Sequence, residues 1–218
     1  MQSNPKPTRR DLPLIKRIND RLSRDFFDRA TSTVAHQLLG KTLFRYTCGR
    51  WVGGFIVETE AYLPEGDSAS HSARGKTPSN AAMFDQPGTL YVYPIHAKFC
   101  LNAVTEASGL GSAVLIRAIE PTEGIDIMRA NRGYDDIRRL TRGPAMLCQA
   151  LAIDRGQDGI DLIDGSEIVI AEGRSHDPLE VTTTTRIGIS SAAELELRFF
   201  VDGNRFVSGR AGDHRQGT

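Results

Sequence analysis

Hydrophobic residues recur at helical spacing in several parts of the chain. Gly40 follows one of these parts and can adopt the left-handed conformation that ends a helix. Pro121 and Pro144 stand before two others and suit a first helical turn, whose N–H groups need no partner. The helices predicted from this pattern cover residues 14–24, 32–39, 122–132 and 144–152.

Shorter segments alternate between apolar and polar residues, which is the period of a half-buried strand. The turn sequence Thr47-Cys48-Gly49-Arg50 separates the first two segments and predicts a hairpin. Because short turns connect neighbouring strands, we expect a mixed α/β (α+β) fold with largely antiparallel strands. The predicted strands cover residues 41–46, 51–62, 90–93, 99–104, 112–118, 167–172, 182–189 and 197–201.

The segment from residue 63 to residue 90 interrupts this order of elements. It is rich in Gly, Pro, Ser, Asp and Asn, and a loop of this length is usually functional or disordered. We interpret it as functional. This loop and the elements around it are predicted to form one domain over residues 13–210, between polar tails at residues 1–12 and 211–218.

The charges of the chain change what its composition implies. Its 218 residues include 27 Lys or Arg and 27 Asp or Glu, and a neutral chain is not typical of a nucleic-acid-binding protein. Residues 1–50, however, carry 11 basic and 4 acidic side chains, whereas residues 151–218 carry 7 and 12. The basic first part is either a solvated helix face with a polar terminus or a phosphate-binding strip.

The cysteines and the apolar segments point to a compartment. Cys48, Cys100 and Cys148 form neither a C-x-x-C motif nor a zinc-binding spacing, which predicts reduced thiols without a structural metal. The sequence contains no run of about 18 apolar residues, which a membrane span would need. Its first residues also lack the apolar segment of a signal peptide. We therefore expect a cytoplasmic protein, associated with the nucleoid if bacterial.

Candidate chemistry begins at the end of the second predicted strand. In Val57-Glu58-Thr59-Glu60-Ala61-Tyr62, alternation places Glu58, Glu60 and Tyr62 on one face. Two carboxylates beside an aromatic ring are either an exposed, salt-bridged strand face or a buried functional group, because a buried carboxylate must be paired.

Further polar and aromatic residues follow in the loop and in the next strands. Taken singly, each has an ordinary structural explanation; together they supply hydrogen-bonding groups, stacking rings and a cation, which are what an enzyme needs to read and excise a flipped base. A Ser-His-Asp triad is excluded by spacing, and Lys76 and Lys98 lie in no apolar run that would make either a nucleophile. The residues of this group are Asp67, Ser70, His71, Tyr91, Tyr93, His96, Lys98, Asn102 and Arg117.

Ordered sequence blocks with nearly constant spacing make the chain recognisable. Over roughly residues 24 to 208 it resembles the alkyladenine (3-methyladenine) DNA glycosylase family, whose members are monofunctional base-excision enzymes. The matching blocks are RDFF from Arg24, LLGK from Leu38, VETEAY from Val57, ASH from Ala69, MF from Met83, PGTLYVY from Pro87, LIRAIEP from Leu115, GP from Gly143, LCQAL from Leu147 and RIGI from Arg186.

The resemblance implies a role for individual residues. Glu60 would be the general base that activates water, and Arg117 would support this carboxylate and the water, so these two are the expected catalytic residues. The expected base-binding residues stack on the extruded base, hydrogen-bond to it or exclude guanine, and His96 would be the wedge that enters the DNA. The base-binding residues are Tyr62, Ala69, His71, Tyr93 and Asn102.

The resemblance also implies a fold and a substrate. The fold would be a single domain with a curved, largely antiparallel sheet, flanking helices and a protruding β-hairpin for the DNA minor groove. The partner would be double-stranded DNA with damaged purines, namely 3-methyladenine, 7-methylguanine, ethenoadenine or hypoxanthine. No metal, cofactor, membrane or protein partner is implied, and we expect a monomer that lacks lyase activity at the abasic site.

The chain departs from the family pattern at the wedge. A Tyr-Gly-Met run is replaced by His96-Ala97-Lys98, and an imidazole covers less area than a phenol ring. A family Lys is replaced by Met146, which removes one expected phosphate contact, and the pair before the Arg-Phe strand is Glu196-Leu197. These changes put the range of substrates in question more than the type of reaction.

Two other functions fit parts of the pattern. A carbohydrate glycosidase could use Glu58 and Glu60 as a carboxylate pair, since residues two apart on a strand lie roughly 6.6 Å apart. A non-catalytic DNA-damage-binding protein could flip bases with His96 and not excise them.

Overall fold

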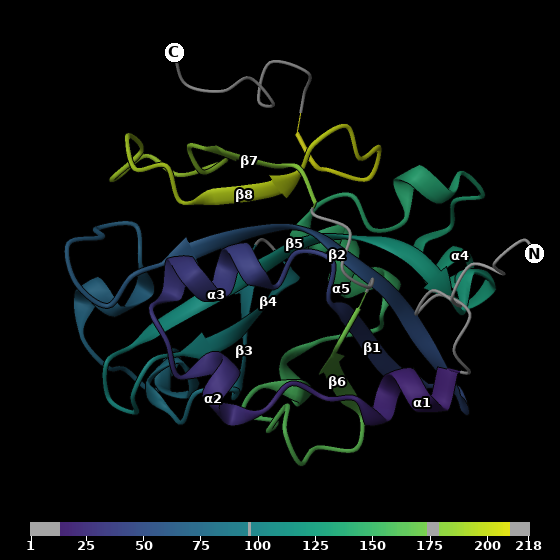
Figure 1. Ribbon diagram of the computed structural model, residues 1–218, viewed down its shortest axis with the longest axis horizontal. Helices are drawn as coiled ribbons and strands as arrows, with labels where there is room; N and C mark the ends of the chain where they lie inside the picture. Colours follow the sequence, from purple (N-terminus) through teal and green to yellow (C-terminus); the bar gives the residue numbers. More distant parts are fainter. Residues whose placement is uncertain (1–13, 96, 174–178, 210–218) are drawn as a thin grey trace, which may run out of the picture.

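The predicted strands join into one antiparallel sheet (Figure 1). The computed structural model describes residues 14–95, 97–173 and 179–209; the two predicted tails lie outside them. Strands β7 (Val181–Thr184) and β8 (Arg198–Val201) pair with each other, and β8 joins the sheet through β2. The other strands follow one another across the sheet in the order β3 (Leu90–Ile95), β4 (Lys98–Thr105), β5 (Ser112–Glu123), β2 (Arg50–Tyr62), β1 (Thr42–Thr47) and β6 (Ile168–Ala171).

Strand β2 is the centre of this sheet. One edge pairs with β5, while the other edge pairs with β1 along its first half and with β8 at Glu58 to Glu60. The pairing with β5 is irregular between Gly53 and Gly54 and around Glu58, and such irregularities bend a strand and increase its twist. The sheet is therefore curled, as expected. Gly54 is required at the close approach to β5, because a Cβ atom there would lie 1.9 Å from the carbonyl oxygen of Glu120.

Short helices flank the sheet. Among the described residues, no helix is long and apolar enough to cross a membrane. The α-helices are α1 (Leu14–Asn19), α2 (Arg24–Phe27), α3 (Thr31–Gln37), α4 (Ile125–Arg132) and α5 (Pro144–Ala150). Single 3₁₀ turns are formed by η2 (His71–Arg74), η3 (Ala81–Phe84), η4 (Ile137–Arg139) and η5 (Arg155–Gln157).

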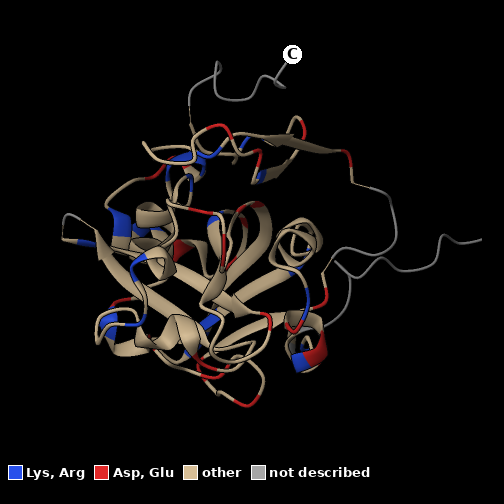
Figure 2. Cartoon of the chain, turned by 90° about the vertical axis from the view of Figure 1, so that its left-hand side faces the viewer, with Lys and Arg blue, Asp and Glu red and all other residues tan. Residues whose placement is uncertain are grey.

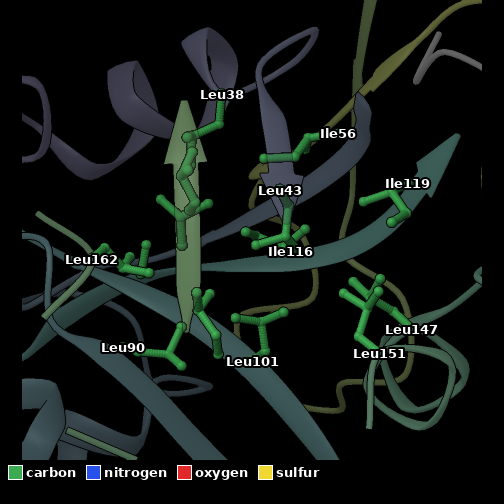
Figure 3. Close-up of a cluster of buried hydrophobic side chains, with 14 of the residues drawn as sticks. Leu38, Leu43, Ile56, Leu90, Leu101, Ile116, Ile119, Leu147, Leu151 and Leu162 are labelled. Atoms are coloured by element: carbon green, nitrogen blue, oxygen red, sulfur yellow. The ribbon is translucent and has the colours of Figure 1, made fainter. Parts of the chain in front are cut away.

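The main hydrophobic core lies between one face of the sheet and helices α3 and α5. Leu38, directly after α3, and Leu147 from α5 belong to the same buried cluster as Ile116 from β5 (Figure 3). Burying each such side chain contributes roughly 1.5–3 kcal/mol. Since strand residues alternate, the opposite sheet face carries a second set of side chains, and a smaller cluster there includes Met83 and Tyr91.

Most of the predicted elements are confirmed, and three need correction. The β1–β2 hairpin, helix α5, and helix α3 followed by Gly40 at φ +79° are found where expected. The helix predicted from residue 122 is wrong at its start, because β5 continues through Pro121 to Glu123. The strand tolerates this proline because the pairing is irregular here and Thr122 has no partner across from it.

The other two corrections also concern ends of elements. The predicted helix 14–24 ends at Asn19; Arg21 instead forms a bridge with Ala171 at the edge of the sheet, and α2 begins separately at Arg24. The strand predicted over residues 182–189 ends at Thr184, because the chain then turns and directs Arg186 into the protein interior.

Three basic residues of the first part of the chain pair with carboxylates of the acidic last part. Arg24, Lys41 and Arg45 lie 2.7, 2.8 and 2.6 Å from the carboxylates of Asp161, Glu172 and Glu167. The charge of these three residues is thus used within the protein rather than in a phosphate-binding strip. On the side of the molecule where the loop after β2 lies, Figure 2 shows basic and acidic residues interspersed.

Candidate active site

Three predicted residues, Tyr91, Asn102 and Glu60, are brought together by the strand register. Tyr91 on β3 lies opposite Asn102 on β4, Asn102 lies opposite Leu115 on β5, and Leu115 lies opposite Glu60 on β2. Strands are spaced by about 4.8 Å, so this row crosses four strands within a short distance. Tyr62, Tyr93 and Arg117 lie two residues from members of the row and therefore on the same face.

Glu60 is fully buried and held by three donors. One oxygen, Oε1, accepts a hydrogen bond of 2.8 Å from the backbone N–H of Ile187. The other, Oε2, accepts from the Tyr62 hydroxyl at 3.1 Å and lies 3.1 Å from Nη1 of Arg117. An ionised carboxylate accepts at both oxygens, so the arrangement fixes the orientation of this group against the Tyr62 ring.

Glu58 is also fully buried, but its oxygens are committed to other partners. Arg117 and Arg198 each donate through Nε to Oε1, at 3.0 and 2.8 Å, and Ser208 donates its N–H to Oε2 at 2.7 Å and its hydroxyl to Oε1 at 3.0 Å. Burial alone would raise the pKa of Glu58, but these partners lower it below its usual value. Glu58 is therefore a structural anion.

Arg117 connects the two carboxylates. Its Nε binds Glu58, its Nη1 binds Glu60 and its Nη2 donates to the Ser208 hydroxyl at 3.1 Å. Burial would lower the pKa of Arg117, but the two carboxylates outweigh this effect and raise the pKa above its usual value. The guanidinium is thus held charged beside Glu60.

Aromatic rings form the walls of a narrow cavity, and one of them, Tyr62, is the hydrogen-bond partner of Glu60. Tyr62 borders it from β2 and Tyr93 from β3. The ring of His71, on η2, meets the Tyr93 ring edge to face with 4.5 Å between centroids. Burial, and then the neighbouring carboxylate of Glu60, hold the pKa of Tyr62 well above its usual value, so its hydroxyl remains a donor.

Tyr91 orients His71. The Tyr91 hydroxyl lies 2.8 Å from Nδ1 of His71. Burial and the charge of Arg74 lower the pKa of His71, while burial and the charge of Asp158 raise the pKa of Tyr91 to about 12. The direction of this hydrogen bond depends on the tautomer of the imidazole.

The cavity is too small to hold a base. Its volume is about 20 Å³, enough for roughly one water molecule. Asn102 lines it and uses its amide to donate to the Tyr91 carbonyl at 3.0 Å. A larger hollow of about 300 Å³ lies on the outer side and shares His71, Tyr91 and Tyr93 with the cavity. A planar base can enter only if the aromatic side chains separate.

Two residues with a predicted role in DNA binding, Ala69 and His96, remain. Ala69 lies in the loop beside the site, and its N–H donates to Asp67 at 3.1 Å, so its carbonyl is the backbone group left for a base. His96 lies outside the described residues, and its role as a wedge stays a prediction. The next residue, Ala97, has φ +59° where the family pattern has glycine, a conformation that costs a non-glycine residue roughly 1 kcal/mol.

Three residues that hold the site were not among the predicted candidates. Strand alternation indicates the candidate Tyr91, which shares a face with Tyr93. Arg186, Arg198 and Ser208 could not be found in this way, since they reach Asp67 and Glu58 from segments 119 to 150 residues away in the chain.

Some other chemistries find no matching groups in the described part of the chain. Among these residues, no group of three or more His, Cys, Asp or Glu side chains could hold a metal ion. Lys76 and Lys98 are exposed, and neither lines the cavity. Cys100 and Cys148 are buried, as predicted, and burial raises the pKa of both thiols.

The lowered pKa of His71 predicts a pH dependence of stability. The unfolded chain takes up a proton at His71 near the usual pKa of about 6.5, whereas the folded protein does so only at lower pH. The free energy of unfolding should therefore fall as the pH drops below about 6.5. Between pH 7.5 and pH 5.5, the unfolding temperature should decrease more for the wild type than for His71→Gln. Equal decreases for the two proteins would show that the pKa of His71 is not lowered by folding.

Comparison with known proteins gives a consistent result. The family model described as Methylpurine-DNA glycosylase (MPG) matches residues 25–205. A protein of Rhodopirellula baltica is 58% identical over 200 residues, covering 89% of this chain and 86% of the relative. Proteins of Prosthecochloris aestuarii (45% identity, 86% of this chain, 91% of the relative) and Mesorhizobium japonicum (46%, 82%, 86%) are also similar. All three carry the name "Putative 3-methyladenine DNA glycosylase".

Proposed function

This chain belongs to the methylpurine-DNA glycosylase family, and we propose that it flips damaged purines out of double-stranded DNA and hydrolyses their N-glycosidic bond. The substrates would be 3-methyladenine, 7-methylguanine, ethenoadenine and hypoxanthine. The observation that carries this proposal is the hydrogen bond between Glu60 and Tyr62 at the cavity. It ties the carboxylate that can activate water directly to a ring on which a base can stack.

The proposed reaction follows from the charges at this site. The base enters when His71 moves away from the edge of Tyr93, and it stacks on the Tyr62 and Tyr93 rings. Breaking the glycosidic bond builds positive charge on the sugar, which the Glu60 carboxylate stabilises while it takes a proton from the attacking water. In nucleotides, 3-methyladenine and 7-methylguanine already carry positive charge, so they leave as neutral bases, and aromatic faces attract such cations. Ethenoadenine and hypoxanthine are neutral in the nucleotide and must gain a proton to leave as neutral bases.

Arg117 has a supporting role in this proposal. It lies 3.1 Å from Glu60 and is fixed from behind by Glu58 and Ser208. The carboxylate is thereby kept in one orientation, which is the preorganisation that general-base catalysis needs. Asn102 and the Ala69 carbonyl are proposed to contact the edge of the base, and His96 to fill the gap left in the duplex.

The carbohydrate glycosidase receives no support from the geometry. Glu58 is fully buried and bound by Arg117, Arg198 and Ser208, so it has no oxygen left for a sugar or a water. A lyase reaction would need an amine nucleophile at the cavity, and no described lysine lines it. We therefore propose hydrolysis without strand cleavage. We also propose that the protein is cytoplasmic and acts as a monomer.

Base release from defined duplexes tests this proposal. Each of the four lesions is placed in a duplex, with an undamaged duplex of the same sequence as the control. We expect free base in solution and an abasic strand that breaks only after alkali. Strand cleavage without alkali, or a complex trapped by borohydride, would contradict the hydrolytic assignment. Tight binding of the lesion without free base would indicate a damage-binding protein instead.

A further inference from the structure

A buried ion pair lies behind the Tyr62 ring. Arg186 donates to both carboxylate oxygens of Asp67, at 2.6 and 2.7 Å, and neither side chain is exposed to solvent. Arg186 also donates to the Ala61 carbonyl at 3.0 Å, next to Tyr62 in the chain. Burial acts against both charges, but the pairing still lowers the pKa of Asp67 and raises that of Arg186.

The Arg186 guanidinium also contacts the aromatic ring itself. It lies over the Tyr62 ring at 4.7 Å from the centroid. Its Nε is buried and has no hydrogen-bond partner among the described residues, and the cation–π contact with the ring adds to the pairing of the guanidinium with Asp67. Arg186 does not line the cavity that Tyr62 borders, so the guanidinium contacts this ring from outside the cavity.

The same ion pair reaches the Glu60 carboxylate. Ile187 follows Arg186 in the chain, and its N–H is the donor to Oε1 of Glu60. On the opposite side, Asp67 accepts from the N–H groups of Leu63 and Ala69, both at 3.1 Å. One ion pair thus connects the loop after β2, the ring of Tyr62 and the backbone group that holds Glu60.

We propose that Asp67 and Arg186 are positioning residues that fix Tyr62 and Glu60 relative to each other. This inference rests on the function proposed above. A buried ion pair contributes little net stability compared with apolar residues of the same size, so fold stability is a weak reason for one at this place. Its bidentate geometry instead prevents the Arg186 plane from rotating away from the ring.

A single isosteric substitution tests this proposal. Asp67→Asn removes the charge that holds Arg186 and keeps the size of the side chain. The control is Asp161→Asn, because Asp161 also binds an arginine (Arg24, 2.7 Å) and a backbone N–H (Ile163, 2.8 Å), but that arginine donates to the Pro87 carbonyl and does not contact Tyr62. Three quantities are measured: the single-turnover rate of base release, the fluorescence of ethenoadenine stacked in the site, and the unfolding temperature.

We expect Asp67→Asn to lower the rate of base release by about 10- to 100-fold, because small misplacements of reacting groups have effects of this size. The fraction of stacked ethenoadenine should fall as well. Asp161→Asn should change neither quantity, although both variants unfold at lower temperature. Arg186→Lys keeps the charge without the planar fork, and should give the same result as Asp67→Asn with a smaller loss of stability.

Two results separate this inference from the proposed function. In the first result, the wild type releases base, and Asp67→Asn and Arg186→Lys are both folded at the assay temperature and match the wild type in rate and fluorescence. The positioning role is then wrong, while the glycosylase function stands. If the wild type releases no base from any lesion, the proposed function is wrong. The fluorescence of the variants then still reports whether the ion pair positions Tyr62.

Discussion

Glu60→Gln is expected to lower the single-turnover rate of base release by about 10²- to 10⁴-fold, the usual contribution of a general base. The amide cannot accept the proton of the attacking water, and its dipole stabilises a cationic sugar less than a carboxylate does. The substitution conserves shape, but the amide has a single oxygen, which can keep either the bond from Ile187 at Oε1 or the contact with Arg117 at Oε2. The rate is measured with excess protein on a 7-methylguanine duplex.

Glu58→Gln is the matched control for this prediction. Glu58 lies two residues away on the same face of β2 and also binds Arg117. Because all its contacts are structural, Glu58→Gln should mainly lower the free energy of unfolding and cause a much smaller loss of rate. A large loss in Glu58→Gln together with a small loss in Glu60→Gln would reverse the two assignments.

The second large effect is expected on stability. Arg198 is fully buried; its Nε donates to Glu58 at 2.8 Å and its Nη2 to the Ser208 carbonyl at 3.2 Å. Arg198→Met leaves the Glu58 carboxylate with one arginine fewer in the protein interior. Removing one partner of a buried pair costs about 3–5 kcal/mol, which corresponds to roughly 10 °C in unfolding temperature for a chain of this length.

Urea unfolding of Arg198→Met and of Arg50→Met measures this effect. Arg50 also pairs with a carboxylate, that of Asp126, but the two side chains are 55% and 69% exposed. An exposed pair contributes at most about 1 kcal/mol, so Arg50→Met should unfold close to the wild-type midpoint. Equal midpoints for the two variants would show that the buried cluster around Glu58 does not support the fold.

The part of the site that lies on strands was predictable from sequence. The two-residue period of β2, β3 and β5 places Glu60, Tyr62, Tyr93 and Arg117 on one face, and antiparallel pairing brings that face together. The resemblance to a known family added a role for each residue. The structure adds the hydrogen bond that joins Glu60 to Tyr62.

The parts of the site that depend on loops were not predictable. The pairing of Asp67 with Arg186 joins residues 119 positions apart, and neither segment has a hydrophobic period that would indicate the contact. The small volume of the cavity depends on the rotamers of His71 and Tyr93. The sequence does not indicate these rotamers. The helix predicted to begin after Pro121 was wrong at its start, because a proline fits a strand with irregular pairing as well as it fits a first helical turn.

The central claim is that the aromatic rings recognise the base and Glu60 removes it. The most direct test follows an ethenoadenine duplex in one cuvette, with fluorescence reporting stacking of the flipped base and free base measured in parallel. We predict that the wild type and Glu60→Gln both produce the stacking signal, and that only the wild type then releases the base. Release by Glu60→Gln at the wild-type rate, or stacking without release by the wild type, would contradict this account.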